Sequence, residues 1–193
     1  AARRPARRGP AASILALAYW ANGELEAAHH ALAEAMAGFQ KSGNIIFALS
    51  GTYGLADLRI GQGRLREAIR IYERALQLAQ SQGDPPVPGT ADLYLGLGKL
   101  YYERGDGDEA RQNLAKSEAL GEQAALADWP YRLRIAQARI KQADGDMDSA
   151  ITLLDEAEML YFDTPVPNPR PIVALKAQVW IAQGRLMDAL DWA

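Results

Sequence analysis

Cysteine is absent from this 193-residue sequence, and its absence excludes several kinds of site. Without cysteine there is no disulfide framework, no thiolate nucleophile and no cysteine-bound zinc or iron–sulfur centre. Long hydrophobic runs are also missing, because no stretch approaches the roughly 18 consecutive apolar residues of a membrane-spanning helix. The opening residues AARRPARRGP lack the apolar run of a signal peptide. These absences predict a cytoplasmic protein with no membrane partner.

Basic residues are scarce outside the first ten positions. Four of the 21 Lys and Arg lie within residues 1–10, so residues 11–193 hold 17 basic and 24 acidic residues, a net charge of −7. Nucleic-acid-binding surfaces need clustered Lys and Arg to replace phosphate counterions. We therefore expect no DNA to bind here, and we expect residues 1–10 to be a poorly ordered basic linker or arm.

What the sequence does contain is a repeat centred on glycine. The central glycines are 40, 42, 40 and 39 residues apart, and each is followed five residues later by alanine. A second small residue stands seven positions before each glycine. The glycines are Gly23, Gly63, Gly105, Gly145 and Gly184; the alanines are Ala28, Ala68, Ala110, Ala150 and Ala189; the preceding small residues are Ala16, Ala56, Gly98, Ala138 and Ala177.

This pattern predicts hairpins of two closely packed antiparallel helices. Facing helices approach closely only where their side chains are small, and glycine supplies the backbone freedom that the turn requires. Asp106 and Asp146, which follow two of the glycines, are suited to cap the next helix. First helices are expected near 11–22, 46–61, 90–103, 131–143 and 171–182, and second helices near 25–41, 65–81, 108–125, 148–161 and from 186 onward.

These hairpins predict one all-α domain over residues 11–193. No stretch shows the strict alternation of a half-buried strand, and Pro-rich connections at 84–90 and 163–171 separate neighbouring hairpins. Each hairpin leaves an apolar face that the next one covers, which is the organisation of an α-solenoid. The expected hairpins are 11–41, 45–82, 89–125, 130–161 and 171–193.

The glycine, the alanine after it and the small residue before it resemble the tetratricopeptide repeat (TPR), with a period near 40 residues in place of about 34. Phrases such as ADLRIGQGRLREAIRIYERALQLA and NPRPIVALKAQVWIAQGRL are similar to the TPR-like sensor region of large ATP-dependent LuxR-family (MalT-like) transcriptional regulators. The resemblance covers about residues 11–193. It implies a right-handed α-solenoid of about five TPR-like hairpins.

The resemblance also implies a function. It indicates a non-enzymatic module that senses a signal for a transcriptional activator by binding an effector or a protein partner in its concave groove. ATP would bind an upstream domain absent here, so no cofactor is expected, and the sequence stops inside a predicted helix, as a fragment of a longer regulator would. Other domains of that regulator are expected partners, and self-association is a further expectation. A stand-alone TPR scaffold for protein–protein interaction is the alternative.

The expected groove follows from the TPR resemblance. First helices line the concave side of such a solenoid, and the groove positions lie thirteen, ten, six and three residues before each turn glycine. Aromatic rings at these positions could stack on sugars or bury apolar side chains, while polar groups fix orientation. The same residues could instead solvate an exposed face or pack beneath the next repeat. The candidates are Trp20, Tyr53, Asp57, Asp92, Lys99, Tyr102, Arg132, Arg139, Gln142 and Gln178.

Other chemistry has weaker support in the sequence. No groove position carries asparagine, which argues against a clamp for the carboxylate tails of chaperones. Both histidines lie in one dipeptide, so no catalytic triad can be assembled. A stripe of Glu26, His30 and Glu34 could hold a metal ion but also reads as a solvated helix face. The Asp144–Asp146–Asp148 series imitates a calcium loop but lacks its glycine, because Ser149 stands there. We expect neither a metal site nor catalytic residues.

Overall fold

The structure, a computed structural model, describes residues 8–161 and 172–190. Every regular element in these ranges is a helix, and the predicted all-α solenoid is confirmed. The elements are α1 (Arg8–Ala21), α2 (Leu25–Lys41), α3 (Ile45–Ser50), α4 (Thr52–Gly61), α5 (Leu65–Gln80), α6 (Thr90–Glu103), α7 (Gly107–Leu120), the short 3₁₀ helix η2 (Glu122–Ala124), α8 (Trp129–Ala143), α9 (Met147–Leu160), α10 (Ile172–Ala182) and α11 (Leu186–Leu190).

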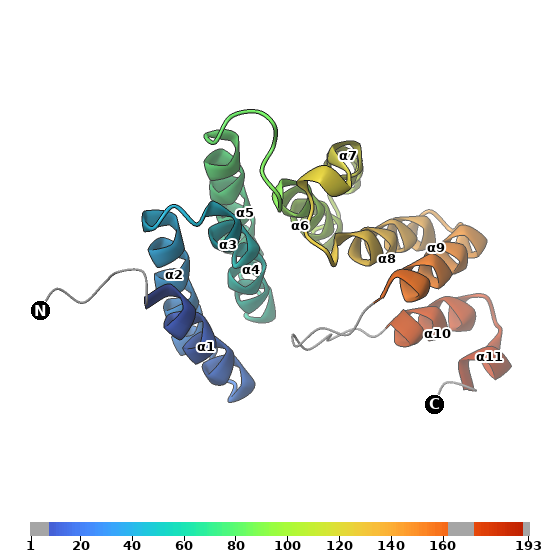
Figure 1. The fold of residues 1–193 in the computed structure, drawn as a ribbon. Coiled ribbons are helices and arrows are strands. Elements are labelled where there is room, and N and C mark those ends of the chain that lie inside the picture. The colour runs from blue at the N-terminus through green and yellow to red at the C-terminus, as the bar shows by residue number, and fades with distance from the viewer. Residues whose placement is uncertain (1–7, 162–171, 191–193) are drawn as a thin grey trace, which may run out of the picture.

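The hairpins follow one another along a curved path (Figure 1). The first helices α1, α4, α6, α8 and α10 lie toward the inside of the curve, and the second helices, most clearly α7 and α9, lie on its outside. We call the side formed by α4, α6 and α8 the inner surface. Among the described residues, no helix is both long and apolar enough to cross a membrane.

The turns form as the glycine pattern predicts. All five turn glycines adopt a φ between 71° and 83°, a left-handed conformation that other residues rarely adopt. The alanines five residues later are buried at the helix crossings; Ala28, Ala68, Ala110 and Ala150 have no exposed surface. At the third crossing a Cβ on Gly98 would lie 2.8 Å from Leu114 Cδ2, so the missing side chain at position 98 leaves room for Leu114 of α7.

Twelve residues after the turn glycine, the first, second and fourth hairpins carry Ala35, Ala75 and Ala157, whereas the third carries Ser117. This serine is fully buried. Its hydroxyl donates to Ala91 O at 2.7 Å and accepts from the Trp129 indole Nε1 at 2.8 Å. The serine therefore ties α7 to α6 and to the start of α8.

Neighbouring hairpins are joined by larger side chains. Tyr72 of α5 is buried against α6, where a Cβ on Gly96 would lie 2.3 Å from the Tyr72 ring. Leu93, Leu97 and Leu100 of α6 complete this core with residues of α4 and α5. The glycine in α6 thus admits the tyrosine ring, and the second and third hairpins share one hydrophobic core.

Several boundaries differ from the prediction. The helix expected at 46–61 is interrupted at Gly51, where a Cβ would lie 1.9 Å from Met36 Sδ of α2. The helix expected to reach 125 ends at Leu120, because Gly121 takes a φ of 63° and a ψ of −165° that no helix continues. Asp146 caps α9 by accepting from Ser149 N at 3.2 Å, as predicted. Asp106 makes no such cap bond and pairs with Arg104 instead, so that expectation was wrong.

Residues 8–10 of the predicted basic linker or arm are helical, because helix α1 begins at Arg8. Residues 1–7 lie outside the described residues, as do 162–171 and 191–193, which hold parts of the second Pro-rich connection and of the last predicted hairpin.

Candidate functional site

Two arginines of α8 organise the polar groups of the inner surface. Arg132 and Arg139 are seven residues apart, which places them about 10 Å from one another along the helix axis. Each guanidinium lies over a tyrosine ring from an earlier first helix: Arg132 over Tyr53 of α4 at 4.6 Å, and Arg139 over Tyr102 of α6 at 4.9 Å. All four residues were predicted groove positions, and the structure brings them together in two pairs.

The first pair belongs to a group, built around the buried Asp92, that we call the Arg132 cluster: Tyr53, Asp92, Asp128 and Arg132. Arg132 Nη1 lies 3.3 Å from Asp92 Oδ1 and 3.2 Å from Asp128 Oδ2. The Asp92 side chain has no exposed surface, and its other oxygen accepts from Leu126 N at 2.8 Å. The Tyr53 hydroxyl donates to Gly89 O at 3.4 Å. The cluster therefore connects α4, α6 and α8, together with the loops that precede the latter two.

Burial is the largest single influence on the pKa values of Asp92, Tyr53 and Arg132 in this cluster. It raises the pKa of Asp92 to about 6, although Arg132 and the Leu126 amide act in the opposite direction. It also raises the pKa of Tyr53 well above its ordinary value. Burial lowers the pKa of Arg132, but Asp128, Tyr53 and Asp92 outweigh it, so that the net direction is upward. Arg132 is thus a permanent cation that compensates a buried carboxyl.

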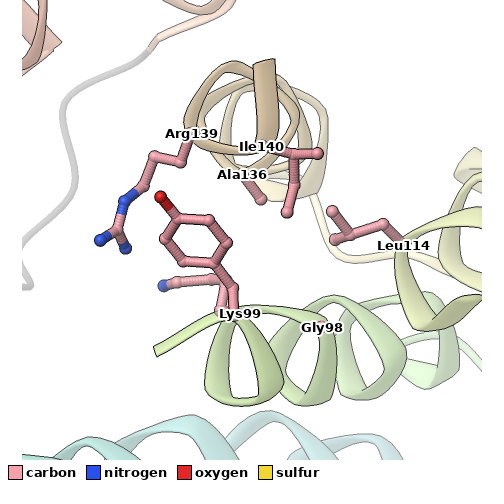
Figure 2. Close-up of a pocket in the computed structure, with 7 residues that line it drawn as sticks. Gly98, Lys99, Leu114, Ala136, Arg139 and Ile140 are labelled. Atoms are coloured by element: carbon pink, nitrogen blue, oxygen red, sulfur yellow. The ribbon is translucent and has the colours of Figure 1, made fainter. Parts of the chain in front are cut away.

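The second pair borders a hollow between α6, α7 and α8 that we call the Arg139 hollow. It is lined by an apolar group from three helices and by the polar residues Lys99, Tyr102 and Arg139. Figure 2 shows the nitrogen ends of Lys99 and Arg139 reaching to the same side, opposite Leu114. The hollow measures about 190 Å³, including space open to solvent. Its apolar residues are Gly98, Leu114, Ala136 and Ile140.

Arg139 is held less completely than Arg132. Its Nη1 donates to Glu103 Oε1 at 2.6 Å, and its side chain is 21% exposed, compared with 16% for Arg132. Glu103 is its one hydrogen-bond partner among residues 8–161 and 172–190. Because a guanidinium carries five N–H donors, Arg139 has donors that these residues do not use.

The remaining predicted groove residues stay outside both groups. Asp57 of α4 and Gln178 of α10 are exposed, and Gln142 at the end of α8 is half-buried. Trp20 of α1 is half-buried beside α4, where a Cβ on Gly54 would lie 3.7 Å from its ring. Within the described ranges, none of the four makes a hydrogen bond or ion pair with the Arg132 cluster or the Arg139 hollow. Asp92, being fully buried, supports the inner surface from beneath and does not line it.

The sequence did not reveal the carboxylates that pair with the two arginines, nor the apolar residues that line the Arg139 hollow. Glu103 precedes a turn glycine by two positions, and Asp128 lies in the junction ADWP, so neither occupies a TPR groove position. A signal was present in the Asp128–Arg132 spacing, since residues four apart on a helix face one another. Nothing in the local sequence indicates that Glu103 meets Arg139 from another helix.

The two candidate metal sites from the sequence, the Glu26 stripe of α2 and the Asp144–Asp146–Asp148 series, contain residues that form ordinary ion pairs. Glu26 Oε1 lies 2.8 Å from both Arg59 Nη1 and Arg64 Nη1, and Arg59 is buried between α2 and α5. The hydrogen bond from Arg59 is the main cause that lowers the pKa of Glu26. Asp144 is paired with Arg111 across neighbouring hairpins. In the part of the chain that the structure describes, no group of three or more His, Asp or Glu is arranged to hold a metal ion.

Comparisons with known proteins agree with this architecture. A family model described as "MalT-like TPR region" matches residues 3–193. A chain of the APC/C hetero-tetramer Cut9–Hcn1 is similar over 98% of this chain, with 20% identity and a TM-score of 0.71, but this chain spans 33% of its length. A thermophilic TPR protein of Thermus thermophilus is similar over 95% of this chain and 87% of its own, with 20% identity and a TM-score of 0.66.

A third solved structure, the apo form of the quorum sensor NprR from B. thuringiensis, is similar over 95% of this chain and 63% of its own, with 16% identity and a TM-score of 0.57. At such identities these likenesses show the fold alone. A search of curated proteins gave no match.

Proposed function

The chain belongs to the MalT-like TPR region family, and from this we propose that it is the signal-sensing and protein-interaction module of a LuxR-family transcriptional activator. It is a binding module without catalytic activity. Its effector or partner is held on the inner surface, at the C-terminal half of α6 and α8. The regulator context rests on the family to which the chain belongs, and the binding role rests on the geometry of the Arg139 hollow.

The observation that carries the binding role is an arginine with unused donors beside an apolar hollow. Arg139 is partly exposed, has one hydrogen-bond partner among the described residues, and adjoins the apolar side chains of Leu114, Ala136 and Ile140. Binding sites combine apolar surface with a few oriented polar groups, and this is the combination found here. The Arg132 cluster lacks it, because its guanidinium is already held by two carboxylates.

A sensor of this kind works by differential affinity. An effector on the inner surface shifts the equilibrium between two arrangements of the full-length regulator only if it binds one of them more tightly than the other. In the proposed regulator, ATP is bound by an upstream domain and promoter DNA by a downstream helix-turn-helix, so this chain needs no cofactor and binds no DNA. The favoured arrangement would self-associate in the cytoplasm and activate transcription.

A scaffold for protein–protein interaction is the alternative function, and the size of the hollow favours it. Pockets for small molecules commonly enclose about 300–1,000 Å³, whereas the Arg139 hollow is a shallow depression whose volume of about 190 Å³ includes open solvent. A shallow depression of this kind suits contact with the surface of a protein partner better than the enclosure of a whole metabolite.

Thermal unfolding of the full 193-residue chain tests the binding role. A bound molecule stabilises the folded state by RT ln(1 + [L]/Kd), so the midpoint should rise with concentration of a true effector. We expect Tyr102→Ala to abolish the rise and Gln178→Ala, on the exposed face of α10, to leave it unchanged. A hit whose stabilisation survives Tyr102→Ala contradicts the assigned surface. If this chain shifts promoter DNA in a gel at physiological salt, the proposal that a different domain of the regulator binds DNA is contradicted.

A further inference from the structure

We propose that His29 makes the junction between the first and second hairpins a pH-sensitive joint, which loosens when the imidazole gains a proton. The joint is formed by a polar group that we call the Arg59 cluster, which ties α2 to the end of α4 and the start of α5. None of its members belongs to the Arg132 cluster or the Arg139 hollow, so the inference goes beyond the proposed function. The members are Glu26, His29, Arg59, Gln62, Arg64 and Glu67.

The protonation state of His29 follows from the atom that it faces. Arg59 Nη2 lies 3.1 Å from His29 Nδ1. A guanidinium has N–H donors and no acceptor, so Nδ1 must accept this hydrogen bond and carries no proton. The single proton of the neutral ring is therefore on Nε2. A second proton would have to bind Nδ1, where it would replace an accepted hydrogen bond with an N–H group that points at a cationic donor.

The guanidinium of Arg59 has little freedom to turn away from a protonated ring. Arg59 is 8% exposed, and its Nη1 donates to Glu26 Oε1 at 2.8 Å and to Gln62 Oε1 at 2.6 Å. Its Nε lies 3.3 Å from Glu67 Oε2. Arg64 donates to the same two carboxylates, each at 2.8 Å. The charged groups around the imidazole are thus two arginines and two glutamates. Relief of an unfavourable contact requires α2 to move relative to α4.

These surroundings oppose protonation of the ring. Burial is the largest cause that lowers the pKa of His29 below its ordinary value of 6.5. The two arginines lower the pKa further, and the two glutamates only partly offset them. When α2 separates from α4, the ring regains its ordinary pKa and binds a proton more readily than in the closed joint. The joint therefore has its full strength above about pH 6.5 and loses strength as the pH falls below that value.

The position of this cluster in the repeat distinguishes the first junction from the second. His29 stands six residues after its turn glycine, and Arg59 stands four residues before the next one. The same positions at the second junction hold Ile69 and Tyr101, which pack in the core shared by the second and third hairpins. A titratable polar contact at the first junction thus occupies the place of an apolar contact at the second.

The apolar contacts of the first junction also include partly exposed side chains. Leu32 and Met36 of α2, which approach glycines of the second hairpin, are both half-buried. Phe39 stacks on Phe47 with 5.4 Å between ring centroids, and Phe47 is 60% exposed. Because part of this surface already contacts water, a displacement of α2 uncovers less apolar area than the same displacement at a fully buried junction.

Hydrogen exchange of the full 193-residue chain, followed by mass spectrometry and corrected for the intrinsic effect of pH, tests the inference. If the ring stays neutral in the closed joint and regains a pKa of 6.5 in the open one, opening becomes up to about tenfold more favourable between pH 7.5 and pH 5.5. We expect the amides of α1 and α2 to lose protection by up to that factor, and we expect no such loss in α7.

Two matched variants assign the effect to one ring. The amide oxygen of His29→Gln can accept from Arg59 but does not titrate, so this variant should lose the pH response of α1 and α2. His30→Gln removes the exposed neighbouring histidine and should keep the response. Comparison of each variant with the wild type at the same pH cancels the contribution of other titrating groups, including Asp92.

Nitrogen-15 NMR of the two histidine rings gives a readout that needs no variant. We expect the neutral form of His29 to carry its proton on Nε2 and to titrate below pH 6.5. A proton on Nδ1, or a pH response that survives in His29→Gln, overturns the inference. Equal losses of protection in α2 and α7 also overturn it, because the effect would then belong to the whole fold and not to one joint. None of these measurements uses an effector, so their failure leaves the proposed function standing.

Discussion

Arg132 and Arg139 lie on the same helix and make the same first contact, yet they belong to different kinds of structure. Each guanidinium covers a tyrosine from an earlier repeat. Arg132 then meets two carboxylates, one of them fully buried, whereas Arg139 meets one carboxylate that is 35% exposed. We therefore propose that an arginine–tyrosine pair forms a joint between repeats where its carboxylate is buried, and a surface open to a partner where its carboxylate is exposed.

Arg132 and Arg139 differ in their surroundings because of the loops at the N-terminal ends of α6 and α8. The segments before α6 and α8 meet there, and Gly89 N donates to Ala124 O at 2.9 Å. Both segments also bond to the Arg132 cluster, through Gly89 O and Leu126 N. They enclose the N-terminal ends of α6 and α8, while the C-terminal ends, where Lys99, Tyr102 and Arg139 lie, border the Arg139 hollow.

The largest expected effect is the loss of stability in Arg132→Ala. Removing one partner of a buried ion pair leaves an uncompensated buried charge and commonly costs about 3–5 kcal/mol. Because Asp92 has no exposed surface, we expect a loss of about 3 kcal/mol in the free energy of unfolding at pH 7.5, measured by urea denaturation.

The double variant Arg132→Ala with Asp92→Asn provides the matched control. Without the buried carboxyl, the same loss of the arginine should cost clearly less, so the two changes should not be additive. Additive losses would mean that Arg132 acts by packing on Tyr53 and not by compensating Asp92.

The second prediction concerns the pH dependence that Asp92 gives to stability. Its pKa is raised to about 6 in the folded protein from an ordinary value of 3.8. The folded state therefore binds the proton more tightly, so this contribution to stability is fully present below pH 3.8 and is lost as the pH rises through about 6. The groups facing the carboxyl are Arg132, Asp128 and the Leu126 amide, with Tyr53 and Tyr72 beyond them.

Asp92→Asn removes this titration. The unfolding free energy of the variant minus that of the wild type should rise between about pH 4 and pH 7, by up to roughly 3 kcal/mol for a pKa raised from 3.8 to about 6. Asp146→Asn is a control of opposite sign, because the hydrogen bond from Ser149 and the pairing with Lys141 lower the pKa of Asp146. For Asp146→Asn, the unfolding free energy of the variant minus that of the wild type should fall as the pH rises from below the pKa of Asp146 in the folded protein. A flat curve for Asp92→Asn contradicts the buried state of this carboxyl.

Much of this fold, and less of the inner surface, could be predicted from the sequence. The glycine and alanine spacing identified the helix pairs because those residues act within one hairpin, where sequence distance and spatial distance agree. The end of α7 at Leu120 and the break at Gly51 depend on a glycine conformation and on Met36 from another helix. The groove positions identified both arginine–tyrosine pairs, but they gave no reason to treat the Tyr53–Arg132 pair differently from the Tyr102–Arg139 pair. Only the placement of Asp92, Asp128 and Glu103 distinguishes the two pairs.

Gly98→Ala tests the floor of the Arg139 hollow and should have an intermediate effect. The new Cβ would lie 2.8 Å from Leu114 Cδ2 and 3.2 Å from Ala110 O, so the Leu114 side chain must shift and α7 must move slightly away from α6. Overpacking of this kind costs about 1–3 kcal/mol, which thermal unfolding followed by circular dichroism would detect. Gly61→Ala at the end of α4 is the matched control, since nothing lies within 4 Å of its Cβ, and it should be neutral or slightly stabilising.

The smallest effect is expected for Arg139→Ala, the counterpart of the first prediction. Its partner Glu103 is 35% exposed and can be solvated when the arginine is removed. An exposed ion pair contributes about 0–1 kcal/mol and the contact with Tyr102 about 0.5–1 kcal/mol, so the loss should stay near 1 kcal/mol.

The salt dependence of stability should separate Arg139→Ala from Arg132→Ala more sharply. Raising sodium chloride to about 1 M screens exposed charges more than buried ones, so the stability difference should shrink for Arg139→Ala and persist for Arg132→Ala. Equal losses, or equal responses to salt, would mean that both arginines are structural joints and that the hollow has no cation available to a partner.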